Sequence, residues 1–416
     1  MTAAVDHRGR PRVAITGLGV KTPAGCDLGT FWSTVVSGRS TADRLTLVDP
    51  EPLPVTFGCE ASDFDVSPYL GPKEARRLDR VTQLAWASAA DAFEDAGRPA
   101  GDPAANAVVV GSGVGGLRSI EDQIGVYAEK GAARVSPFLV PMMMINASAG
   151  EIGMQLGWTG PTFVVATACA ASTNALGEAA RLIRDGTSDR VIATGTESCM
   201  TPTSISAFAR MGALSRRNDD PASASRPFDA DRDGFVMGEG AASIVLERFD
   251  LAAERGVDIY GEVAGYGRTA DAHHITAPAP GGAGAAACMR EALDDAGVDA
   301  AAVGHVNAHG TSTPLNDAAE SEAITKVFGG PGPPVTSTKG VVGHMIGAGG
   351  AVEAVAALLA MREGIVPPTA NLERPGDDIT VDVVVGEPRR IDRAPAVSNS
   401  FGFGGHNATV ILTPPD

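Results

Sequence analysis

The sequence predicts an α/β fold made of two similar halves, because one set of segments occurs twice along the chain. The heptapeptide DAFEDAG at 91–97 recurs as EALDDAG at 291–297, each after an Ala-rich helical stretch and before an apolar strand that runs into glycine. AVVVGSG (107–113) then corresponds to VGHVNAHG (303–310). The strand, turn and helix that carry ATACAAS likewise correspond to those that carry STKGVVGHMIGAGG. One supersecondary unit has therefore been duplicated.

Short β-branched runs alternate with helical stretches along the chain. VAITGLG (13–19), TFVVATA (162–168) and RVIATGT (190–196) are too apolar to have a solvated face. We therefore expect buried strands of a sheet that helices cover on both sides. The pattern predicts an N-terminal half over residues 1–255 and a C-terminal half over residues 256–416.

Composition limits the possible functions. Of the 416 residues, 44% are hydrophobic and 20% charged, which is typical of a compact globular protein. A net charge of -17 argues against a nucleic-acid partner, because phosphates attract clustered Lys and Arg. The start of the sequence lacks a signal-peptide pattern, and no stretch of about 18 uncharged apolar residues predicts a membrane helix. We therefore expect a cytoplasmic protein that does not enter a membrane.

Two segments resemble cofactor or metal motifs without meeting their full requirements. GSGVGG (111–116) follows a strand and fits GxGxxG, but no clear second strand with a ribose-binding acid follows it. DADRDGFVMGE (229–239) resembles a calcium loop, yet Gly240 stands where the bidentate glutamate belongs. We expect an ordered turn there, held by carboxylate-to-backbone bonds, and neither a metal nor a nucleotide cofactor.

Cys169 stands out among the five cysteines. It follows an apolar strand and precedes an Ala-rich helix, where unpaired amides and the helix dipole favour a thiolate. We therefore expect a thiol that is nucleophilic near neutral pH, the alternative being a buried inert thiol. That alternative is our interpretation of the remaining four, Cys26, Cys59, Cys199 and Cys288. The absence of a CxxC pair predicts free thiols in a reducing compartment.

Two histidines and a lysine lie in polar, Gly-rich segments of the second half. His309 occurs in VNAHGTSTPLND and His344 in STKGVVGHMIGAGG, and we expect both at the ends of strands. Glycine neighbours allow a substrate or another backbone to approach closely, which favours a site over a core histidine. Lys339 lies five residues before His344, and an ordinary surface lysine is the alternative interpretation.

Five blocks of the sequence resemble the signature blocks of β-ketoacyl-[acyl carrier protein] synthase II enzymes: ATACAAS, VNAHGTSTP, STKGVVGHMIGAGG, SRPFDADRDGFVMGEGA and SNSFGFGGHN. The resemblance runs from near residue 13 to the C-terminus. It implies the thiolase fold, in which two βαβαβαββ halves form a five-layered αβαβα sandwich. It also implies an acyltransferase that condenses malonyl-acyl carrier protein, with loss of CO₂, with an acyl group held on Cys169. The chain would grow by two carbons, with no cofactor beyond the carrier's phosphopantetheine.

The resemblance also assigns roles to individual residues. It implies that Cys169 takes the acyl group, that His309 and His344 assist decarboxylation and stabilise the enolate, and that Lys339 orders the histidines. Backbone N–H groups of Cys169 and Phe403 would stabilise the tetrahedral oxyanion, and Phe403 would gate the loaded cysteine. The substrate-binding residues that it implies are Thr311 and Thr313 on the phosphopantetheine arm, and Val114, Phe208 and Phe401. Val114 stands where the family often has isoleucine, so longer or unsaturated chains are expected to fit.

The expected partners follow from the same resemblance. An acidic carrier protein must dock on a basic patch that locally reverses the -17 field. We expect Lys73, Arg76 and Arg77 to share a face of a helix formed by PKEARRLDR, with Arg210 on the other side. The family is dimeric, so a homodimer or a heterodimer with a homologous subunit is expected.

Two other functions on this fold do not fit the residues of the chain. A thiolase needs a second cysteine as base in the C-terminal half, and none follows Cys288. A silent chain-length subunit typically lacks the nucleophile that Cys169 provides. Fatty-acid elongation and a type II polyketide or polyene ketosynthase, working with a chain-length-factor partner, share this chemistry. The sequence leaves these two open.

Overall fold

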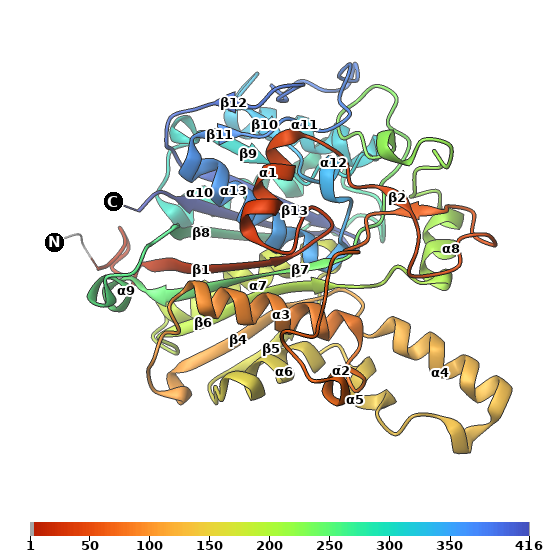
Figure 1. Ribbon diagram of the computed structural model, residues 1–416. Coiled ribbons are helices and arrows are strands. Elements are labelled where there is room, and N and C mark those ends of the chain that lie inside the picture. The colour runs from red at the N-terminus through yellow and green to blue at the C-terminus, as the bar shows by residue number, and fades with distance from the viewer. Residues whose placement is uncertain (1–3, 416) are drawn as a thin grey trace.

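A ten-stranded sheet forms the centre of the computed structural model, which describes residues 4–415 (Figure 1). Its strands from the first half are β1 (Val13–Lys21), β4 (Asn106–Gly111), β5 (Thr162–Val165), β6 (Arg190–Glu197) and β7 (Gly240–Arg248). Those from the second half are β8 (Gly261–Ala270), β9 (His305–Asn307), β10 (Val335–Thr336), β13 (Ala396–Gly402) and β14 (His406–Thr413).

The strand order repeats the same topology on either side of the middle of the sheet. From β1 outward the order is β7, β6, β4 and β5, and from β8 outward it is β14, β13, β9 and β10. β1 and β8 meet antiparallel, with Ala14 opposite Glu262 and Ile15 opposite Gly261. The duplication inferred from the sequence is therefore a duplication of topology.

Helices cover the sheet in layers. α7 (Ala171–Arg184) and α13 (Gly349–Glu363) pack against each other and against strands of both halves. α3 (Arg80–Asp95) covers β1, β6 and β7 on one outer face, and α10 (Ala283–Ala296) covers β8 and β14 on the other. Each half runs βαβαβαββ. With α3 on one outside, α10 on the other, and α7 and α13 between the strands of the two halves, the layers follow the predicted αβαβα order.

Close packing of helix on strand explains the repeated heptapeptide. A Cβ on Gly17 of β1 would lie 2.2 Å from the carbonyl oxygen of Ala92 in α3. A Cβ on Gly265 of β8 would lie 2.2 Å from the carbonyl oxygen of Ala292 in α10. Only glycine fits at such an approach, and alanine on the helix keeps the contact short. The same contact between a strand glycine and a helix alanine therefore joins α3 to β1 and α10 to β8.

A strained turn also occurs in both halves. Ala168 has φ 51° in the turn η3 (Ala168–Ala170) before α7, and Ile346 has φ 44° in the turn η7 (Ile346–Ala348) before α13. Both are non-glycine residues in the left-handed region, which costs conformational energy. Such strain is typical of functional sites, and both turns line the cavity described below.

The remaining elements surround this framework, and Figure 1 shows α4 extending away from the sheet. The helices are α1 (Leu28–Ser37), α2 (Pro72–Ala75), α4 (Leu117–Lys130), α5 (Leu139–Met143), α6 (Ala147–Leu156), α8 (Pro202–Met211), α9 (Phe249–Arg255), α11 (Pro314–Phe328) and α12 (Lys339–Val342). Short 3₁₀ turns are η1 (Pro103–Ala105), η2 (Ala132–Arg134), η4 (Pro221–Ser223), η5 (Pro280–Gly282) and η6 (Ala300–Ala302). Two small sheets pair β2 (Asp43–Arg44) with β3 (Phe57–Gly58), and β11 (Ile365–Val366) with β12 (Arg389–Arg390).

α9 ends at Arg255 and β8 begins at Gly261, so the predicted boundary at residue 255 falls between elements. The division into residues 1–255 and 256–416 stays a prediction. Within residues 4–415, no helix has the length and apolar character needed to cross a membrane.

Two local predictions were wrong. The segment 162–168 was expected to be a fully buried strand, but β5 ends at Val165 and exposes Thr162 and Phe163, because it is the outermost strand of the sheet. PKEARRLDR was expected to be one helix, but α2 stops at Ala75. Asp79 instead starts the next helix, where its side chain accepts from the backbone N–H of Val81.

Candidate active site

Cys169 lies in the turn that joins β5 to α7. Its thiol is buried, and the backbone N–H groups of Phe403 and Cys169 itself act on the sulfur in the direction that lowers its pKa. Gly402 brings its main chain close to this turn, since a Cβ there would lie 3.1 Å from the Cys169 nitrogen. Two converging amides are the arrangement that an oxyanion site requires.

The structure brings both predicted histidines to this thiol. His344 Nε2 lies 3.0 Å from Cys169 Sγ, and the rings of His309 and His344 stand nearly perpendicular with centroids 5.4 Å apart. His309 follows β9, as expected. His344 does not end a strand, contrary to expectation, but lies between α12 and η7. Its backbone N–H donates to the carbonyl of Val236, which fixes this irregular segment.

Lys339 is buried beside the histidines, so the alternative of an ordinary surface lysine was wrong. Its Nζ lies 3.2 Å from His309 Nδ1 and forms an ion pair with Glu353. An ammonium group can only donate, so His309 Nδ1 must accept. The proton of a neutral His309 is therefore carried on Nε2.

Burial dominates the protonation of all three groups. It lowers the pKa of His309 and of His344 well below the usual range, and the Lys339 charge acts in the same direction. Burial also raises the pKa of Cys169 to about 11, although Lys339 and the Phe403 amide oppose it. The expected thiolate at neutral pH is thus wrong for the resting site. A neutral thiol faces neutral imidazoles, because desolvation outweighs the nearby favourable charges and dipoles.

Two carboxylates of this site were missed at the sequence level. Glu320 accepts from the backbone N–H groups of His309, at 2.8 Å, and Gly310, at 2.7 Å, and burial raises its pKa to about 7. Glu353 carries the ion pair with Lys339. It is the single acidic residue in the apolar stretch GGAVEAVAALLAM, and such a lone charge signals a buried partner.

These groups open into a cavity of about 440 Å³. Its lining includes the predicted substrate residues Val114, Phe208, Thr311, Thr313 and Phe401, together with the predicted gate residue Phe403. The hydroxyls of Thr311 and Thr313 are 2.9 Å apart, and the ring centroids of Phe208 and Phe403 are 6.5 Å apart. The cavity thus has an apolar side near Val114 and Phe208 and a hydroxyl-bearing side, which suits an acyl group and a polar arm.

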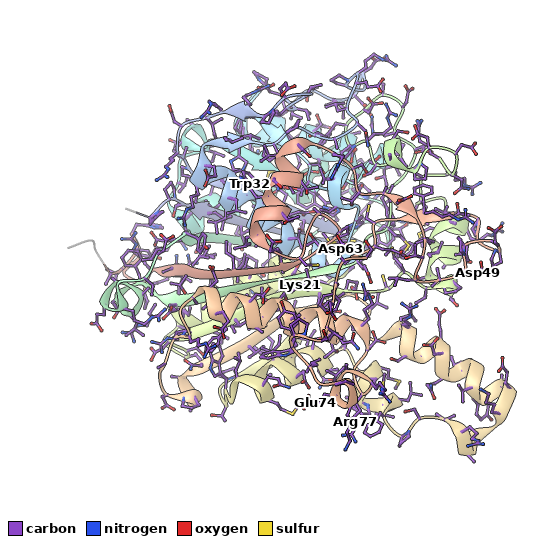
Figure 2. All side chains as sticks on the ribbon, in the orientation of Figure 1. Lys21, Trp32, Asp49, Asp63, Glu74 and Arg77 are labelled. Carbon is purple, nitrogen blue, oxygen red and sulfur yellow. The ribbon has the colours of Figure 1, made fainter. Side chains whose placement is uncertain are left out.

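The predicted docking residues lie outside the cavity. Lys73, Arg76 and Arg77 are exposed on and just after α2, and the Arg77 guanidinium stacks on Phe138 at 4.7 Å from the ring centroid. Figure 2 shows Arg77 near α2 and α5, away from α8. Arg210 is exposed at the end of α8, next to Met211, which lines the cavity. Of the four, Arg210 is therefore the one that adjoins a residue lining the cavity.

The segments that resemble a dinucleotide motif and a calcium loop both make hydrogen bonds to groups of the chain itself. Backbone amides of GSGVGG donate to the carboxylate of Glu197, so a pyrophosphate would have to displace it. In the calcium-like segment, Asp229 accepts from the backbone N–H of Asp231 at 2.8 Å and of Glu373 at 2.9 Å. This is the expected carboxylate-held turn.

Cys169, His309 and His344 also form a possible metal-ligand set, with ligand atoms within 4.8 Å of one another. Cysteine and histidine are suitable ligands for zinc. Lys339 places a positive charge at His309, however, which opposes a bound cation and suits a developing negative charge.

Comparison with known proteins identifies the family. The β-ketoacyl synthase N-terminal domain matches residues 10–252, and the β-ketoacyl synthase C-terminal domain matches residues 260–373. The chain belongs to the β-ketoacyl synthase family. The resemblance inferred from the signature blocks is confirmed, as are the thiolase fold and the class of condensing acyltransferase.

Similar proteins have consistent names. The chain is 45% identical to a 3-oxoacyl-[acyl-carrier-protein] synthase 2 of Synechocystis sp., over 96% of this chain and 97% of the relative. It is 42% identical to a protein of the same name from Staphylococcus aureus, over 96% and 98%. Among solved structures, the ishigamide ketosynthase/chain length factor superposes with TM-score 0.92 at 33% identity, covering 98% of this chain and 100% of that one.

A further structure is a type II polyketide synthase acyl-carrier protein in complex with its ketosynthase bound to the hexaketide. It superposes with TM-score 0.89 at 28% identity and covers 98% of this chain and 100% of that chain.

Proposed function

We propose that this β-ketoacyl synthase condenses a malonyl group with an acyl group held on Cys169, both delivered by an acyl carrier protein. The 3.0 Å contact between Cys169 Sγ and His344 Nε2 carries the assignment, because it joins a nucleophile to a base inside a cavity of suitable size. The names of the relatives, 3-oxoacyl-[acyl-carrier-protein] synthase 2, support the same reaction.

In the first step, Cys169 takes the acyl group. The thiol is neutral at rest, so its proton moves toward His344 Nε2 as sulfur attacks the thioester carbon. The tetrahedral oxyanion accepts hydrogen bonds from the backbone N–H groups of Cys169 and Phe403. When the carbon–sulfur bond to the carrier's phosphopantetheine breaks, the proton passes to the departing sulfur. The products are an acyl-cysteine and a carrier with a free thiol.

In the second step, malonyl thioester loses CO₂ and leaves an enolate. The electron pair of the broken bond moves onto the thioester oxygen, so the site has to stabilise negative charge. His309 donates through Nε2–H, because Lys339 holds its Nδ1 as an acceptor. His344 donates as well after a change of tautomer, because its Nε2, which accepts the thiol proton in the first step, must carry a proton here.

Condensation completes the reaction. The enolate carbon attacks the acyl-cysteine carbonyl, the second oxyanion uses the same two amides, and the carbon–sulfur bond breaks. Cys169 leaves as a thiolate and regains a proton from the solvent, which replaces the one that left with the carrier's thiol, and the chain is two carbons longer. The site residues thus act through positioning and charge stabilisation, and no free cofactor is needed for the balance of atoms.

We propose that the enzyme elongates fatty acyl chains, and we rank the polyketide alternative second. Relatives called 3-oxoacyl-[acyl-carrier-protein] synthase 2 are 42–45% identical to this chain, whereas the ishigamide ketosynthase/chain length factor is 33% identical and the type II polyketide ketosynthase 28% identical. The ketosynthase subunit of a type II polyketide or polyene system, with a chain-length-factor partner, stays the second candidate. Structures of that kind cover the whole fold.

A dimer is part of the proposal. β5 is an outer strand of the sheet with 37% of Phe163 exposed, and Met154 in the neighbouring α6 is 73% exposed. An apolar edge strand of this kind is normally covered by a partner. A second copy or a homologous subunit is the proposed cover. The cytoplasmic location stays a prediction.

Mass spectrometry of the intact protein tests the function. After incubation with acyl-loaded carrier proteins from a fatty-acid and a type II polyketide pathway, we expect the mass of one acyl group on Cys169. Acyl groups from the fatty-acid carrier alone support elongation, and groups from the polyketide carrier alone support the second candidate. Failure of both carriers to load Cys169 overturns the proposal.

A further inference from the structure

Glu197, the last residue of β6, is fully buried behind the catalytic cavity and was not singled out from the sequence. Within residues 4–415, no side-chain cation pairs with its carboxylate. Five donors surround it instead. They are Ser112 Oγ at 3.1 Å, Val114 N at 3.3 Å and Gly115 N at 3.3 Å on Oε1, and Gly113 N at 2.7 Å and Gly347 N at 3.2 Å on Oε2.

These donors come from two different loops. One follows β4 in the first half and carries the motif GSGVGG, and the other is the turn η7 after His344 in the second half. A Cβ on Gly113 would lie 3.0 Å from Glu197 Oε2. A Cβ on Gly347 would lie 2.7 Å from the same oxygen and 2.3 Å from the Gly113 nitrogen. Glycine is therefore required at position 347 for the loops to meet around the carboxylate, and a side chain at position 113 would push against it.

The same two loops form a wall of the cavity beside the nucleophile. Gly113, Val114 and Ile346 all line the cavity that contains Cys169. The Cβ position of Gly113 lies 3.3 Å from Ile346 Cγ2 and 3.7 Å from Ala168 Cα, next to the nucleophile turn. Ile346 is held at φ 44°, so this wall is strained and needs fixed neighbours to keep its shape.

We propose that Glu197 is a positioning residue that fixes Val114 and Ile346 and thereby determines which acyl groups Cys169 accepts. This inference rests on the proposed function. A carboxylate is suited to the position because both of its oxygens only accept, and all five neighbours only need to donate. An amide would turn its NH₂ group toward at least two of these backbone N–H groups and leave them without an acceptor. A long acyl chain needs the ordered wall, whereas an acetyl group ends before it.

The test uses acyl-pantetheine thioesters and the intact full-length protein, with loading of Cys169 followed by mass spectrometry. In Glu197→Gln, we expect the ratio of KM for palmitoyl to KM for acetyl to rise about tenfold, as the loss of a hydrogen bond to a charged group predicts. Acetyl kcat should stay within about twofold of wild type. Ser112→Ala, which removes one donor and leaves the carboxylate, should raise the same ratio by a smaller factor.

Glu239→Gln is the matched control. Glu239 is also a fully buried carboxylate and accepts from Arg80 and Ser198, but neither of these residues lines the cavity. This variant is expected to lower the thermal midpoint without changing the KM ratio. Malonyl decarboxylation, measured in a Cys169→Gln background, should be unaffected by adding Glu197→Gln.

The outcomes separate the inference from the proposed function. The role of Glu197 is overturned if the KM ratio is unchanged in folded Glu197→Gln and Ser112→Ala. It is also overturned if the ratio rises equally in Glu239→Gln. In both cases, loading of the wild-type protein still supports the condensing function. If Glu197→Gln does not fold, Ser112→Ala alone decides, and an unchanged ratio there also overturns the inference. Absence of loading in the wild type with every thioester counts against the proposed function itself.

Discussion

Lys339 Nζ lies 3.2 Å from His309 Nδ1 and is itself held by an ion pair with Glu353. The Lys339 ammonium group thus sets the tautomer of His309. The ring centroid of His309 lies 5.4 Å from that of His344, the histidine that contacts Cys169. Lys339 also keeps His309 neutral, since its charge adds to burial in lowering the pKa of that ring. A neutral donor next to a fixed positive charge is well suited to a developing enolate.

Decarboxylation therefore depends on both histidines and on Lys339. Cys169→Gln mimics an acylated site, and we expect it to release CO₂ from malonyl-carrier protein. Adding His309→Ala or His344→Ala to this variant should lower the rate by about a hundredfold or more, because each removes a donor to the enolate oxygen. Adding Lys339→Met should also lower it, because His309 can then adopt the other tautomer.

The readout is CO₂ release, with Lys326→Met as the control. Lys326 is a surface lysine paired with Glu322, and its loss should leave the rate unchanged. Rates that are insensitive to both histidine changes contradict the assigned roles.

Cys169→Ala is expected to abolish transfer of the acyl group from carrier to enzyme. Cys199 is the matched control, because burial likewise raises its pKa but it does not line the cavity. Cys199→Ala should therefore load at nearly the wild-type level in mass spectrometry of the intact protein. Loading of Cys169→Ala at the wild-type rate would falsify the identity of the nucleophile.

The raised pKa of Cys169 predicts slow alkylation of the free enzyme. With the pKa near 11, the thiolate fraction grows as pH rises, so the rate with iodoacetamide should still be increasing at pH 9. A thiol with a pKa near 7 would instead give a rate that levels off below pH 8.5. Such a plateau would show that helix and amide dipoles outweigh burial. Mass spectrometry of Cys169 at each pH supplies the measurement.

His305 should make the protein sensitive to acid. It is fully buried, neither ring nitrogen has a hydrogen-bond partner within residues 4–415, and burial lowers its pKa to about 4. An unfolded histidine titrates near 6.5, so the unfolded chain binds more protons between these values. Protonation of His305 should therefore lower the free energy of unfolding by roughly 3 kcal/mol as the pH falls from 6.5 to 4.

The comparison of His305→Leu with wild type isolates this effect. Burial raises the pKa of Glu197 and Glu320 to about 7, so these carboxyls change stability with pH in the opposite direction in both proteins. Thermal midpoints between pH 7 and pH 4.5 should fall further in wild type than in His305→Leu. His273→Gln, a change at an exposed histidine, should behave like wild type. Parallel curves for His305→Leu and wild type would show that His305 is not the acid-sensitive group.

The edge strand predicts the effect of a charge on assembly. Phe163→Asp introduces a carboxylate on the exposed apolar part of β5, and we expect the dimer to dissociate in analytical ultracentrifugation. Val385→Asp, at another exposed apolar residue away from β5, should leave the assembly unchanged. A wild-type protein that stays monomeric at all concentrations rules out the proposed dimer.

Much of the fold could be predicted because the duplication is written in local patterns. The strands 13–19 and 190–196 are largely apolar, and the repeated heptapeptide marks the helices that pack on Gly17 and Gly265. The exposure of Phe163 could not be predicted, since an inner and an outer strand have the same apolar pattern. Only the order of strands in the sheet decides which one has a neighbour on each side.

The site was predictable in its residues and less so in its electrostatics. Cys169, His309 and His344 occur in recognisable blocks, but the direction of the Cys169 pKa shift depends on the full extent of burial. Helix position alone indicates a thiolate, whereas desolvation is a property of the three-dimensional site. Glu197 was missed for a similar reason. Nothing in its own segment indicates that glycine loops from both halves converge on it.

The remaining prediction concerns the surface on which the carrier protein docks. The structure makes Arg76 and Arg210, and not Arg77, the residues that test it best. Arg77 stacks on Phe138, so reversing its charge also removes a packing contact, whereas Arg76 is exposed beside it. Arg210 lies next to Met211 at the cavity. We therefore expect Arg76→Glu and Arg210→Glu each to raise the KM for an acidic carrier protein several-fold, because each reverses a local positive charge in a protein of net charge -17.

Salt dependence distinguishes docking from damage to the site. Screening weakens charge attraction, so the wild-type KM for the carrier should rise with ionic strength, and this rise should flatten in both variants. An acyl-pantetheine thioester that lacks the carrier should react equally well with all three proteins. Arg134→Glu, a change at an exposed arginine in η2, provides the control for reversal of one charge elsewhere. If Arg134→Glu matches the other two variants, the effect comes from net charge. If none of the three changes the KM, the carrier docks on another surface.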